Sequence, residues 1–323
     1  MRAPLATKKL VDTRKGRIAY LEAGAPDLPV ALFVHGIPTS SYLWRHVMRA
    51  LEGKLRCLAP DLMGLGDTVV DPATTDFSMP SQAEMLEDFL DALGIGKAHV
   101  VAHDQGGAAA QILVTMREQR VDRLVLTNCV CFDNWPVPTV RNLMRFARLP
   151  GADLVSSTGL MELMETRSAL SRFRRGVVDR AAFTDEAIGE YLRPLRAGPD
   201  ERARFLAFLL AGSPRHTMAI VPRLRELERP TMILWAAEDR YIPLSWGQRL
   251  YETIPGAKRF EVVEGAGHFW PEEKPAPFAA RIGEFLLEAP VARRSSDVDV
   301  IEPGRLTRKK CATAPARAKE GTR

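Results

Sequence analysis

Several features that would indicate a metalloprotein, a disulfide scaffold or a membrane protein are scarce or missing in this sequence of 323 residues. It has four cysteines, Cys57, Cys129, Cys131 and Cys311, and their spacing matches neither a zinc-ligand pair nor a redox Cys-x-x-Cys. We therefore expect free thiols in a reducing compartment, which predicts a cytoplasmic protein. The sequence has no run of 18 apolar residues, so no membrane-spanning helix is expected. The N-terminal stretch also lacks the apolar core of a secretory signal.

A general excess of basic residues is missing as well. The net charge is +5, but residues 291–323 hold nine Lys/Arg and four Asp/Glu and so carry all of it. The first 290 residues are neutral, with 36 charges of each sign, which argues against nucleic acid as a partner of the folded part. Residues 291–323 are rich in Ser, Pro, Ala, Gly and charged residues and have no periodic apolar pattern, which predicts a disordered basic tail.

Short apolar runs without polar alternation are typical of strands that are buried on both faces of a sheet. Helical patterns separate these runs, and one such helix is expected directly after Gly106-Gly107. The sequence therefore predicts an α/β fold, with a mostly parallel central sheet and helices on both faces. The predicted strands cover residues 30–34, 55–59, 98–102, 124–127, 231–236 and 259–263.

The alternation of strands and helices breaks after Asn128, and the next convincing strand begins about 100 residues later, far more than a crossover needs. Helical patches fill this interval, at residues 139–148, 160–173 and 200–210. We therefore expect residues 133–225 to form an inserted helical cap. Residues 1–132 and 226–290 would then form the core.

The stretch from Ala102 to Gly106 (Ala-His-Asp-Gln-Gly) lies directly after one predicted strand and before a predicted helix. Its layout is that of a nucleophile elbow, a sharp turn that presents a catalytic side chain. Small flanking residues are needed because the backbone of the nucleophile is strained and neighbouring backbone packs close. Asp104 occupies the position that serine usually takes, so it is the candidate nucleophile. The other role for an aspartate there is that of a helix N-cap.

Two partners for such a nucleophile follow in the expected chain order of nucleophile, acid and histidine. The strand after the cap ends in Glu238-Asp239, and the next strand is followed by Gly-Ala-Gly-His268. Because the carboxyl ends of parallel strands share one edge of a sheet, these side chains should converge. Asp239 would orient the imidazole of His268, whose other nitrogen would face a water, and Glu238 is the competing acid.

An oxyanion hole is expected beside this triad. A glycine-containing loop, His35-Gly36-Ile37, follows an earlier strand. In this layout the backbone N–H groups of Ile37 and Gln105 would point at the same oxygen.

Five motifs occur in a characteristic order: HGIPTSSYLWR (35–45), PDLMGLGD (60–67), HDQGG (103–107), LWAAED (234–239) and GAGH (265–268). Over about residues 17–290 the chain thereby resembles the α/β-hydrolase superfamily, in the aspartate-nucleophile branch of haloalkane dehalogenases and epoxide hydrolases. The resemblance implies Asp104 as nucleophile, Asp239 as acid and His268 as base. In one subgroup the acid follows the preceding strand, but that position here is Asn128, an amide.

The sequence departs from this branch where a leaving group would be stabilised. Dehalogenases usually have Trp directly after the nucleophile, with a second Trp in the cap or an Asn after the His-Gly pair; here Gln105 and Ile37 occupy the first and last of these positions. Gln105 still offers an amide N–H, and Trp135 is the one tryptophan of the predicted cap. Epoxide hydrolases usually donate to the epoxide oxygen from cap tyrosines, and this cap has one, Tyr191. Tyr191 and Trp135 are therefore the candidate substrate-binding residues.

An aspartate nucleophile favours one class of substrate. Attack on an ester would form a reactive anhydride, whereas attack on an sp3 carbon forms an alkyl–enzyme ester that His268 and a water can hydrolyse. We predict a hydrolase whose partners are a small apolar organic substrate and water, an epoxide in the first place and a carbon–halogen compound as the alternative. This chemistry requires no metal and no organic cofactor. Outside enzymes, the alternative is a non-catalytic small-molecule-binding protein on the same fold. The sequence does not predict the oligomeric state.

Overall fold

The computed structural model describes residues 7–149, 165 and 171–288. The predicted disordered tail and most of the helical patch predicted at 160–173 lie outside the described residues. The residues up to Leu287 form one compact unit.

Within the described residues, eight strands form one sheet in the order β1-β2-β4-β3-β5-β6-β7-β8. The two N-terminal strands pair antiparallel, and all pairs from β4 to β8 are parallel, which confirms the mostly parallel sheet. The strands are β1 (Lys9–Thr13), β2 (Gly16–Ala23), β3 (Val30–Val34), β4 (Arg56–Pro60), β5 (Ala98–Asp104), β6 (Val121–Cys129), β7 (Thr231–Ala236) and β8 (Ala257–Val263).

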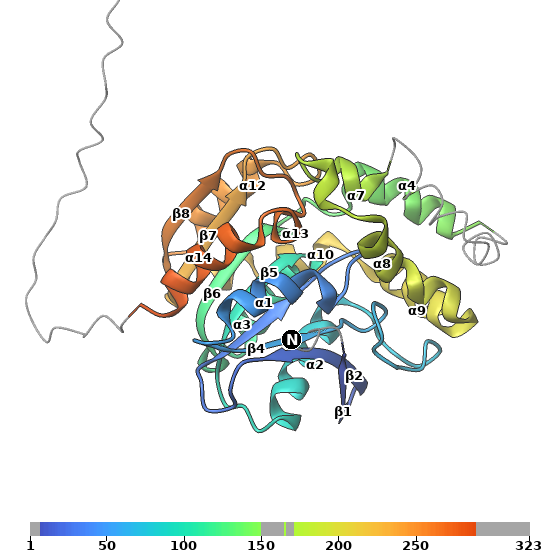
Figure 1. Ribbon diagram of the computed structural model, residues 1–323, viewed down its shortest axis with the longest axis horizontal. Helices are drawn as coiled ribbons and strands as arrows, with labels where there is room; N and C mark the ends of the chain where they lie inside the picture. Colours follow the sequence, from blue (N-terminus) through green and yellow to red (C-terminus); the bar gives the residue numbers. More distant parts are fainter. Residues whose placement is uncertain (1–6, 150–164, 166–170, 289–323) are drawn as a thin grey trace, which may run out of the picture. The chain divides into compact units, whose positions relative to one another are not determined.

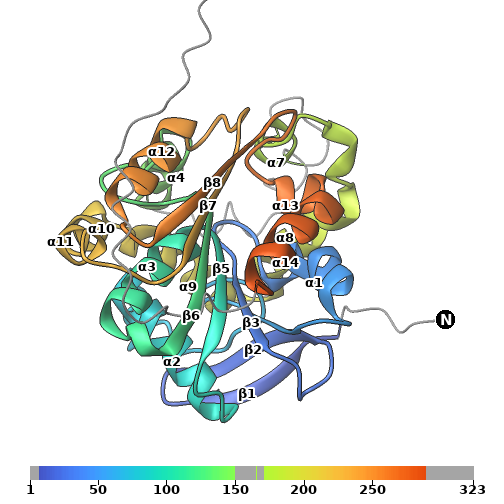
Figure 2. The same ribbon diagram turned by 90° about the vertical axis from the view of Figure 1, so that its left-hand side faces the viewer.

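Helices cover both faces of this sheet, as predicted (Figure 2). On one face α1 packs against α14; on the other, α2 packs against α3, and α12 packs against β7 and β8. These helices and their short neighbours are η1 (Ser41–Trp44), α1 (Arg45–Leu51), α2 (Met79–Ala92), α3 (Gln105–Met116), η2 (Glu118–Arg120), α12 (Leu244–Thr253), α13 (Trp270–Glu273) and α14 (Pro275–Leu286).

Every regular element described between β6 and β7 is helical, which confirms an inserted helical cap. Its helices α4, α7, α8 and α9 lie together at one end of the sheet (Figure 1), with α9 packed between α8 and α4. The predicted cap boundaries at 133 and 225 fall between the end of β6 and the start of β7. The elements are α4 (Pro138–Ala147), α7 (Arg172–Arg175), η3 (Arg180–Ala182), α8 (Asp185–Ala197), α9 (Pro199–Ala211), α10 (Pro214–Ala219) and α11 (Val221–Leu224).

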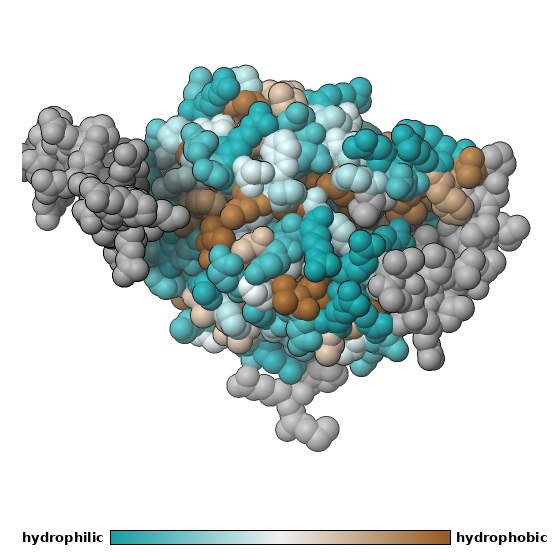
Figure 3. Space-filling model, turned by 90° about the horizontal axis from the view of Figure 1, so that it is seen from above, coloured by the Kyte–Doolittle hydropathy of each residue, from teal (hydrophilic) through white to brown (hydrophobic). Residues whose placement is uncertain are grey.

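The apolar core fills the space between the sheet and its helices. Its largest fully buried side chains include Trp44, Trp235, Trp270, Phe33 and Phe278. The surface is different: on the face seen in Figure 3, hydrophilic residues dominate and hydrophobic ones form small separate clusters. None of the helices in the described part of the chain is long and apolar enough to cross a bilayer.

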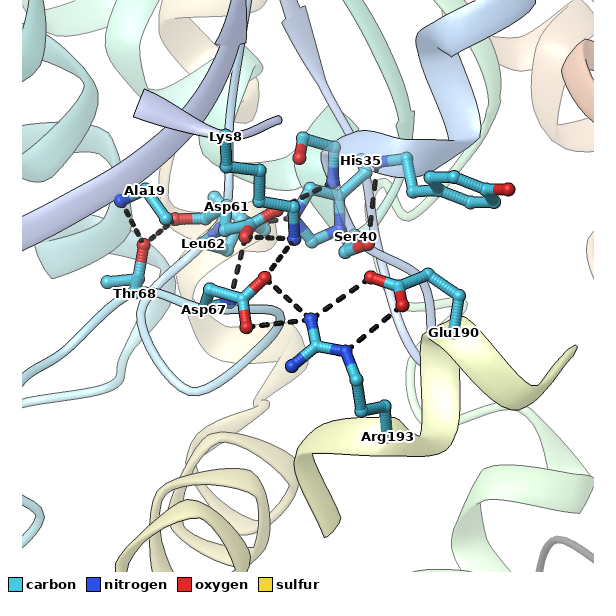
Figure 4. Close-up of polar contacts among 12 residues, drawn as sticks. Lys8, Ala19, His35, Ser40, Asp61, Leu62, Asp67, Thr68, Glu190 and Arg193 are labelled. Carbon is cyan, nitrogen blue, oxygen red and sulfur yellow. Dashed lines mark hydrogen bonds and ion pairs between the residues drawn. The ribbon is translucent and has the colours of Figure 1, made fainter. Parts of the chain in front are cut away.

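A network of charged side chains joins the N-terminal strand, the loop after β4 and the cap (Figure 4). Lys8 donates to Asp61 at 2.7 Å and to Asp67 at 2.6 Å. On the cap helix α8, Arg193 donates to both oxygens of Asp67 at 2.8 Å and to Glu190. The Lys8 ammonium is thus shared between a buried and a half-buried carboxylate, and Asp67 links the core to the cap.

We expect Lys8→Met to lower the free energy of unfolding by about 2–4 kcal/mol, because it leaves the charge of Asp61 without its cation. The Asp61 side chain is fully buried and that of Lys8 is 10% exposed. The matched control is Lys9→Met, which removes an ion pair to Glu22 from a side chain that is 61% exposed and should cost about 0.5 kcal/mol or less. Urea unfolding followed by circular dichroism measures both; equal losses would contradict the expectation.

Candidate active site

The ends of four parallel strands bring the predicted catalytic residues to one edge of the sheet. Asp104 is the last residue of β5, and Ile37 lies in the loop after β3. Asp239 lies in the loop after β7, and His268 in the loop after β8. All of these parallel strands end at the same edge, so residues that are more than 200 positions apart in the chain become neighbours.

Asp104 sits in a strained turn between β5 and α3. Its φ of 51° and ψ of −126° lie where an L-residue is rarely found. The glycines after it permit close packing: a Cβ on Gly106 would lie 2.3 Å from the carbonyl oxygen of His35, and one on Gly107 would lie 2.2 Å from the Cβ of Cys129. Although Asp104 precedes the helix, its side chain makes no capping hydrogen bond, so its carboxylate is not used as an N-cap.

Both predicted oxyanion-hole groups act on the Asp104 carboxylate. The Ile37 N–H donates to Asp104 Oδ1 at 2.8 Å, and the backbone N–H of Gln105 contributes to lowering the pKa of the carboxyl group. Burial alone would raise the pKa of Asp104, but its interaction with His268 outweighs this effect, so the pKa is lowered. These interactions favour the charged form of Asp104, with Oδ1 bound by the Ile37 N–H.

His268 lies between two carboxylates. Its Nδ1 is 2.8 Å from Asp239 Oδ2, and its Nε2 is 3.6 Å from Asp104 Oδ2. All three side chains are buried. Burial alone would lower the pKa of His268, but the charge of Asp239, with further contributions from Asp104, raises it. The structure thus brings together Asp104, Asp239 and His268, the three predicted catalytic residues.

The imidazole of His268 must be neutral to act as a base, and its raised pKa opposes this. In the free protein two negative charges flank the ring, and they favour its protonated form. If Asp104 becomes an ester, one of these charges disappears and the pKa of His268 falls, so the ring can lose its proton. A nearby buried ring, His103, has its pKa lowered to about 4 by burial and does not compete for the proton near neutral pH.

Asp104→Asn should reproduce this change without a substrate. The amide is neutral, so we expect the pKa of His268 to fall by about one unit or more relative to the unmodified protein. An NMR titration of the imidazole measures the shift. His46→Gln, in α1, is the control that should leave the His268 titration unchanged, and an unshifted pKa in Asp104→Asn would contradict the electrostatic coupling.

Asn128 is a site residue whose role the sequence did not predict. It is near the end of β6 with a φ of 41°, and its Nδ2 donates to Asp239 Oδ2 at 2.7 Å while its Oδ1 accepts from the Ala236 N–H at 3.1 Å. The other oxygen of Asp239 accepts from the backbone N–H groups of Tyr241 and Ile242. Asn128 therefore orients the acid, and the signal was its place at the end of a strand beside the one that leads to Asp239.

Glu238, the competing acid, has a different environment. Its two oxygens accept from the backbone N–H groups of Gly265 and Ala266, at 2.9 and 3.0 Å. His103 and His35 also serve loops: His103 Nε2 is 2.8 Å from the His268 carbonyl oxygen, and His35 Nε2 accepts from the Leu62 N–H. These three side chains shape the backbone around the site.

A largely apolar cavity opens onto Asp104 and His268. Its walls come from the oxyanion loop, the cap and the His268 loop, and the residues that line it include Pro38, Val137, Val140, Leu143, Phe173, Leu192, Phe205, Tyr241 and Phe269. Arg172 is the cation in this lining, and its Nε is 2.5 Å from Glu165. In the described ranges, no group of three or more His, Cys, Asp or Glu could hold a metal ion.

Neither of the two predicted substrate-binding residues is among the described residues that line the cavity at Asp104. The hydroxyl of Tyr191 donates to Glu272 Oε2 at 2.9 Å. Trp135 is 3% exposed. A Cβ on Gly212 would be 2.3 Å from Trp135 Nε1 and 3.3 Å from Gln105 Nε2, so the two nitrogens lie near each other beside Gly212. Neither has a hydrogen-bond partner in the described part of the chain.

Known proteins are similar to this chain in sequence and in fold. Haloalkane dehalogenase 2 of Mycobacterium tuberculosis (strain ATCC 25618 / H37Rv) is 28% identical over 283 residues, which cover 84% of this chain and 92% of the relative. An α/β hydrolase fold protein from Burkholderia ambifaria has 26% identity and a TM-score of 0.72, over 86% of this chain and 97% of its own. The epoxide hydrolase CorEH has 24% identity and a TM-score of 0.70, over 86% and 98%, and this likeness shows the fold alone.

A family model agrees with these likenesses. The description of that model is "Alpha/beta hydrolase family", and it matches residues 31–281, a range that includes the sheet from β3 onward, the cap and all three predicted catalytic residues. The chain therefore belongs to the alpha/beta hydrolase family.

Proposed function

We propose that the protein hydrolyses small apolar alkyl halides through a covalent ester on Asp104. In the first step Asp104 Oδ2 attacks the carbon that bears the halogen, the carbon–oxygen bond forms and the carbon–halogen bond breaks. Oδ2 is suited to this attack because the Ile37 N–H binds Oδ1 at 2.8 Å, whereas Oδ2 is 3.6 Å from His268 Nε2. The apolar cavity excludes water and leaves the carboxylate poorly solvated, which favours displacement at an sp3 carbon.

In the second step His268 removes a proton from a water that attacks the carbonyl carbon of the Asp104 ester. The oxyanion forms at Oδ1, where the N–H of Ile37 already donates, and the backbone N–H of Gln105 would add a second donor. Collapse of the tetrahedral intermediate releases the alcohol and restores the carboxylate. Asp239 holds the positive charge on the imidazole from a distance of 2.8 Å.

The observation that carries the choice of halide is the pair of unpartnered N–H donors at Gln105 and Trp135. Buried donors nearly always have a partner, so two neighbouring ones without a partner are candidate ligands for an anion. Gln105 follows the nucleophile directly, and Val137, two residues after Trp135, lines the cavity, whereas Gln105 and Trp135 themselves lie behind that lining. A departing halide needs only weak donors in a dry site, and these two would supply them.

An epoxide, the substrate first predicted from the sequence, needs a stronger donor for its alkoxide. The Tyr191 hydroxyl is bonded to Glu272, and the hydroxyl of Tyr241, which lines the cavity, donates to the Arg172 carbonyl oxygen at 2.5 Å. Both tyrosine hydroxyls thus already donate a hydrogen bond to an acceptor within the protein. This favours the carbon–halogen substrate over the epoxide.

A product assay tests the proposal. The protein is incubated with bromobutane and with a terminal epoxide of the same chain length, and bromide, diol and the mass of the Asp104 peptide are measured. We expect bromide release and transient addition of a butyl group to Asp104. Diol formation without bromide release would support the epoxide alternative, and no product with no added mass on either compound would support a binding protein.

The halide site makes a separate prediction. Trp135→Phe removes one N–H donor and keeps an aromatic side chain, so we expect bromide release to fall about tenfold to hundredfold, since a donor to a developing charge is lost. Trp246→Phe is the matched control, because this ring stacks on Phe132 and should not contact the leaving group. Bromide release measured by ion chromatography compares them, and equal rates for the two variants would contradict the role of Trp135.

A further inference from the structure

Two consecutive glutamates follow His268 in the short helix α13, and each binds a different part of the cap. Glu272 accepts from the Tyr191 hydroxyl in α8 and forms an ion pair with Arg45 of the core. Glu273 Oε1 accepts from the backbone N–H groups of Val178 and Asp179, at 2.9 and 2.7 Å. The segment that follows His268 in the chain is therefore attached to the cap at two points.

The second oxygen of Glu273 reaches back to the His268 loop. Glu273 Oε2 accepts from the Gly267 N–H at 3.0 Å, so one carboxylate bridges a cap segment and the residue next to the histidine. On the other side of the histidine, the Phe269 N–H donates to the Gly176 carbonyl oxygen at 3.1 Å. Both neighbours of His268 are thus fixed to the cap or to a residue that binds it.

The contact between the two segments is close enough to need glycine on both sides. A Cβ on Gly267 would lie 2.5 Å from the Gly176 carbonyl oxygen, and one on Gly176 would lie 2.6 Å from the ring of Phe269. Backbone packs directly on backbone here. A shift of the cap segment at 176–179 therefore moves the loop that carries His268.

Other core residues bind the rest of the His268 loop. Glu238 holds Gly265 and Ala266 from β7, and His103 bonds the carbonyl oxygen of His268. The N–H of Gly267, the next residue of the loop, donates instead to Glu273, which also binds the cap. The position of the imidazole thus depends on the core and, through Glu273, on the cap.

We propose that Glu273 is a positioning residue that joins the cap to the His268 loop and so sets the rate of ester hydrolysis. The inference rests on the proposed function, because it assigns Glu273 to the second step of that reaction. The first step uses Asp104, which β5 and the oxyanion loop hold independently of the cap. The second step requires the imidazole to be aligned with a water and the ester carbonyl, and small displacements there cost large factors in rate.

The test is a single-turnover experiment with bromobutane on Glu273→Ala. Bromide release measures ester formation, and the mass of the Asp104 peptide measures its hydrolysis. We expect ester formation to change less than about threefold and ester hydrolysis to fall about tenfold, so that the butyl adduct accumulates. Glu273→Gln keeps one acceptor oxygen and should give an intermediate rate of hydrolysis.

Two controls separate positioning from general destabilisation. Glu264→Ala makes the same charge change at an exposed position of the same loop and should leave both steps unchanged. Thermal unfolding of each variant reports stability. Loss of both steps in equal proportion, or no change in either, would overturn the role of Glu273.

His268→Gln, measured in the same experiment, tests the covalent mechanism itself. If His268→Gln accumulates the adduct and Glu273→Ala behaves like Glu264→Ala, the inference about Glu273 is wrong and the covalent mechanism stands. If His268→Gln takes up no alkyl group, the mechanism itself is wrong and the inference about Glu273 is wrong with it.

Discussion

His268→Gln is expected to stop the reaction after the first displacement. Steady-state turnover should fall about a thousandfold or more, because the variant has no base for the attacking water. One equivalent of bromide should still be released, since Asp104 remains in its turn with the Ile37 N–H on Oδ1. Intact-mass measurement should then show a stable protein that is heavier by the alkyl group.

The adduct must also be located. Peptide mapping should place the added mass on the peptide that contains Asp104, and Asp104→Ala should take up none. His103→Gln is the control. His103 bonds the His268 carbonyl oxygen but is not the base, so this variant should not accumulate the adduct. A His268→Gln protein that turns over at the normal rate, or an adduct on a different residue, would contradict the roles of His268 and Asp104.

Asp104→Gly is expected to abolish activity and, at the same time, to be more stable than Asp104→Ala. Both variants lack the carboxylate and so lose the covalent route, with a loss of about four orders of magnitude or more in turnover. They differ in the turn itself, where φ is 51° and ψ is −126°. Glycine adopts this backbone freely, whereas alanine retains the strain of an L-residue, which costs about 1–3 kcal/mol.

The expected order of stability is the reverse of the usual one. In most helices and strands alanine is more stable than glycine by about 0.5–1 kcal/mol. Denaturant unfolding of the two variants measures the difference, and it does not depend on any substrate. If Asp104→Ala were the more stable of the two, the strain of the elbow would be refuted, although the catalytic role of Asp104 would not.

The centre of the sheet could be predicted from the sequence because β3 to β7 are largely buried and read as apolar runs. The predicted runs at 30–34 and 231–236 coincide with β3 and β7. Other strands are longer than predicted: β6 begins at Val121, where the polar Asp122 and Arg123 hide its start. The antiparallel strands β1 and β2 were not predicted. β1 is exposed and mostly polar, whereas β2 does contain a buried apolar stretch, residues 18–21.

The clustering of Asp104, Asp239 and His268 could be predicted because each lies at the end of a strand or in the loop that follows one, and the geometry of a parallel sheet brings these positions together. The roles of cap residues could not, because they depend on side-chain directions that a helical pattern does not give. Tyr191 was predicted to be a donor to the substrate, yet its hydroxyl faces Glu272. The same holds for Glu273, whose partners in the cap are backbone groups 95 and 94 residues away and leave no motif in the sequence.

The amide of Asn128 determines how many negative charges surround the imidazole on this side. A carboxylate there would stand 2.7 Å from Asp239 Oδ2, and two carboxylates at that distance would share a proton and not both remain charged. Next to the imidazole, the end of β6 therefore carries a neutral amide, Asn128, and the loop after β7 carries the charged Asp239. Exchanging the two side chains, as in Asn128→Asp with Asp239→Asn, would keep the net charge and move the anion from the loop after β7 to the end of β6.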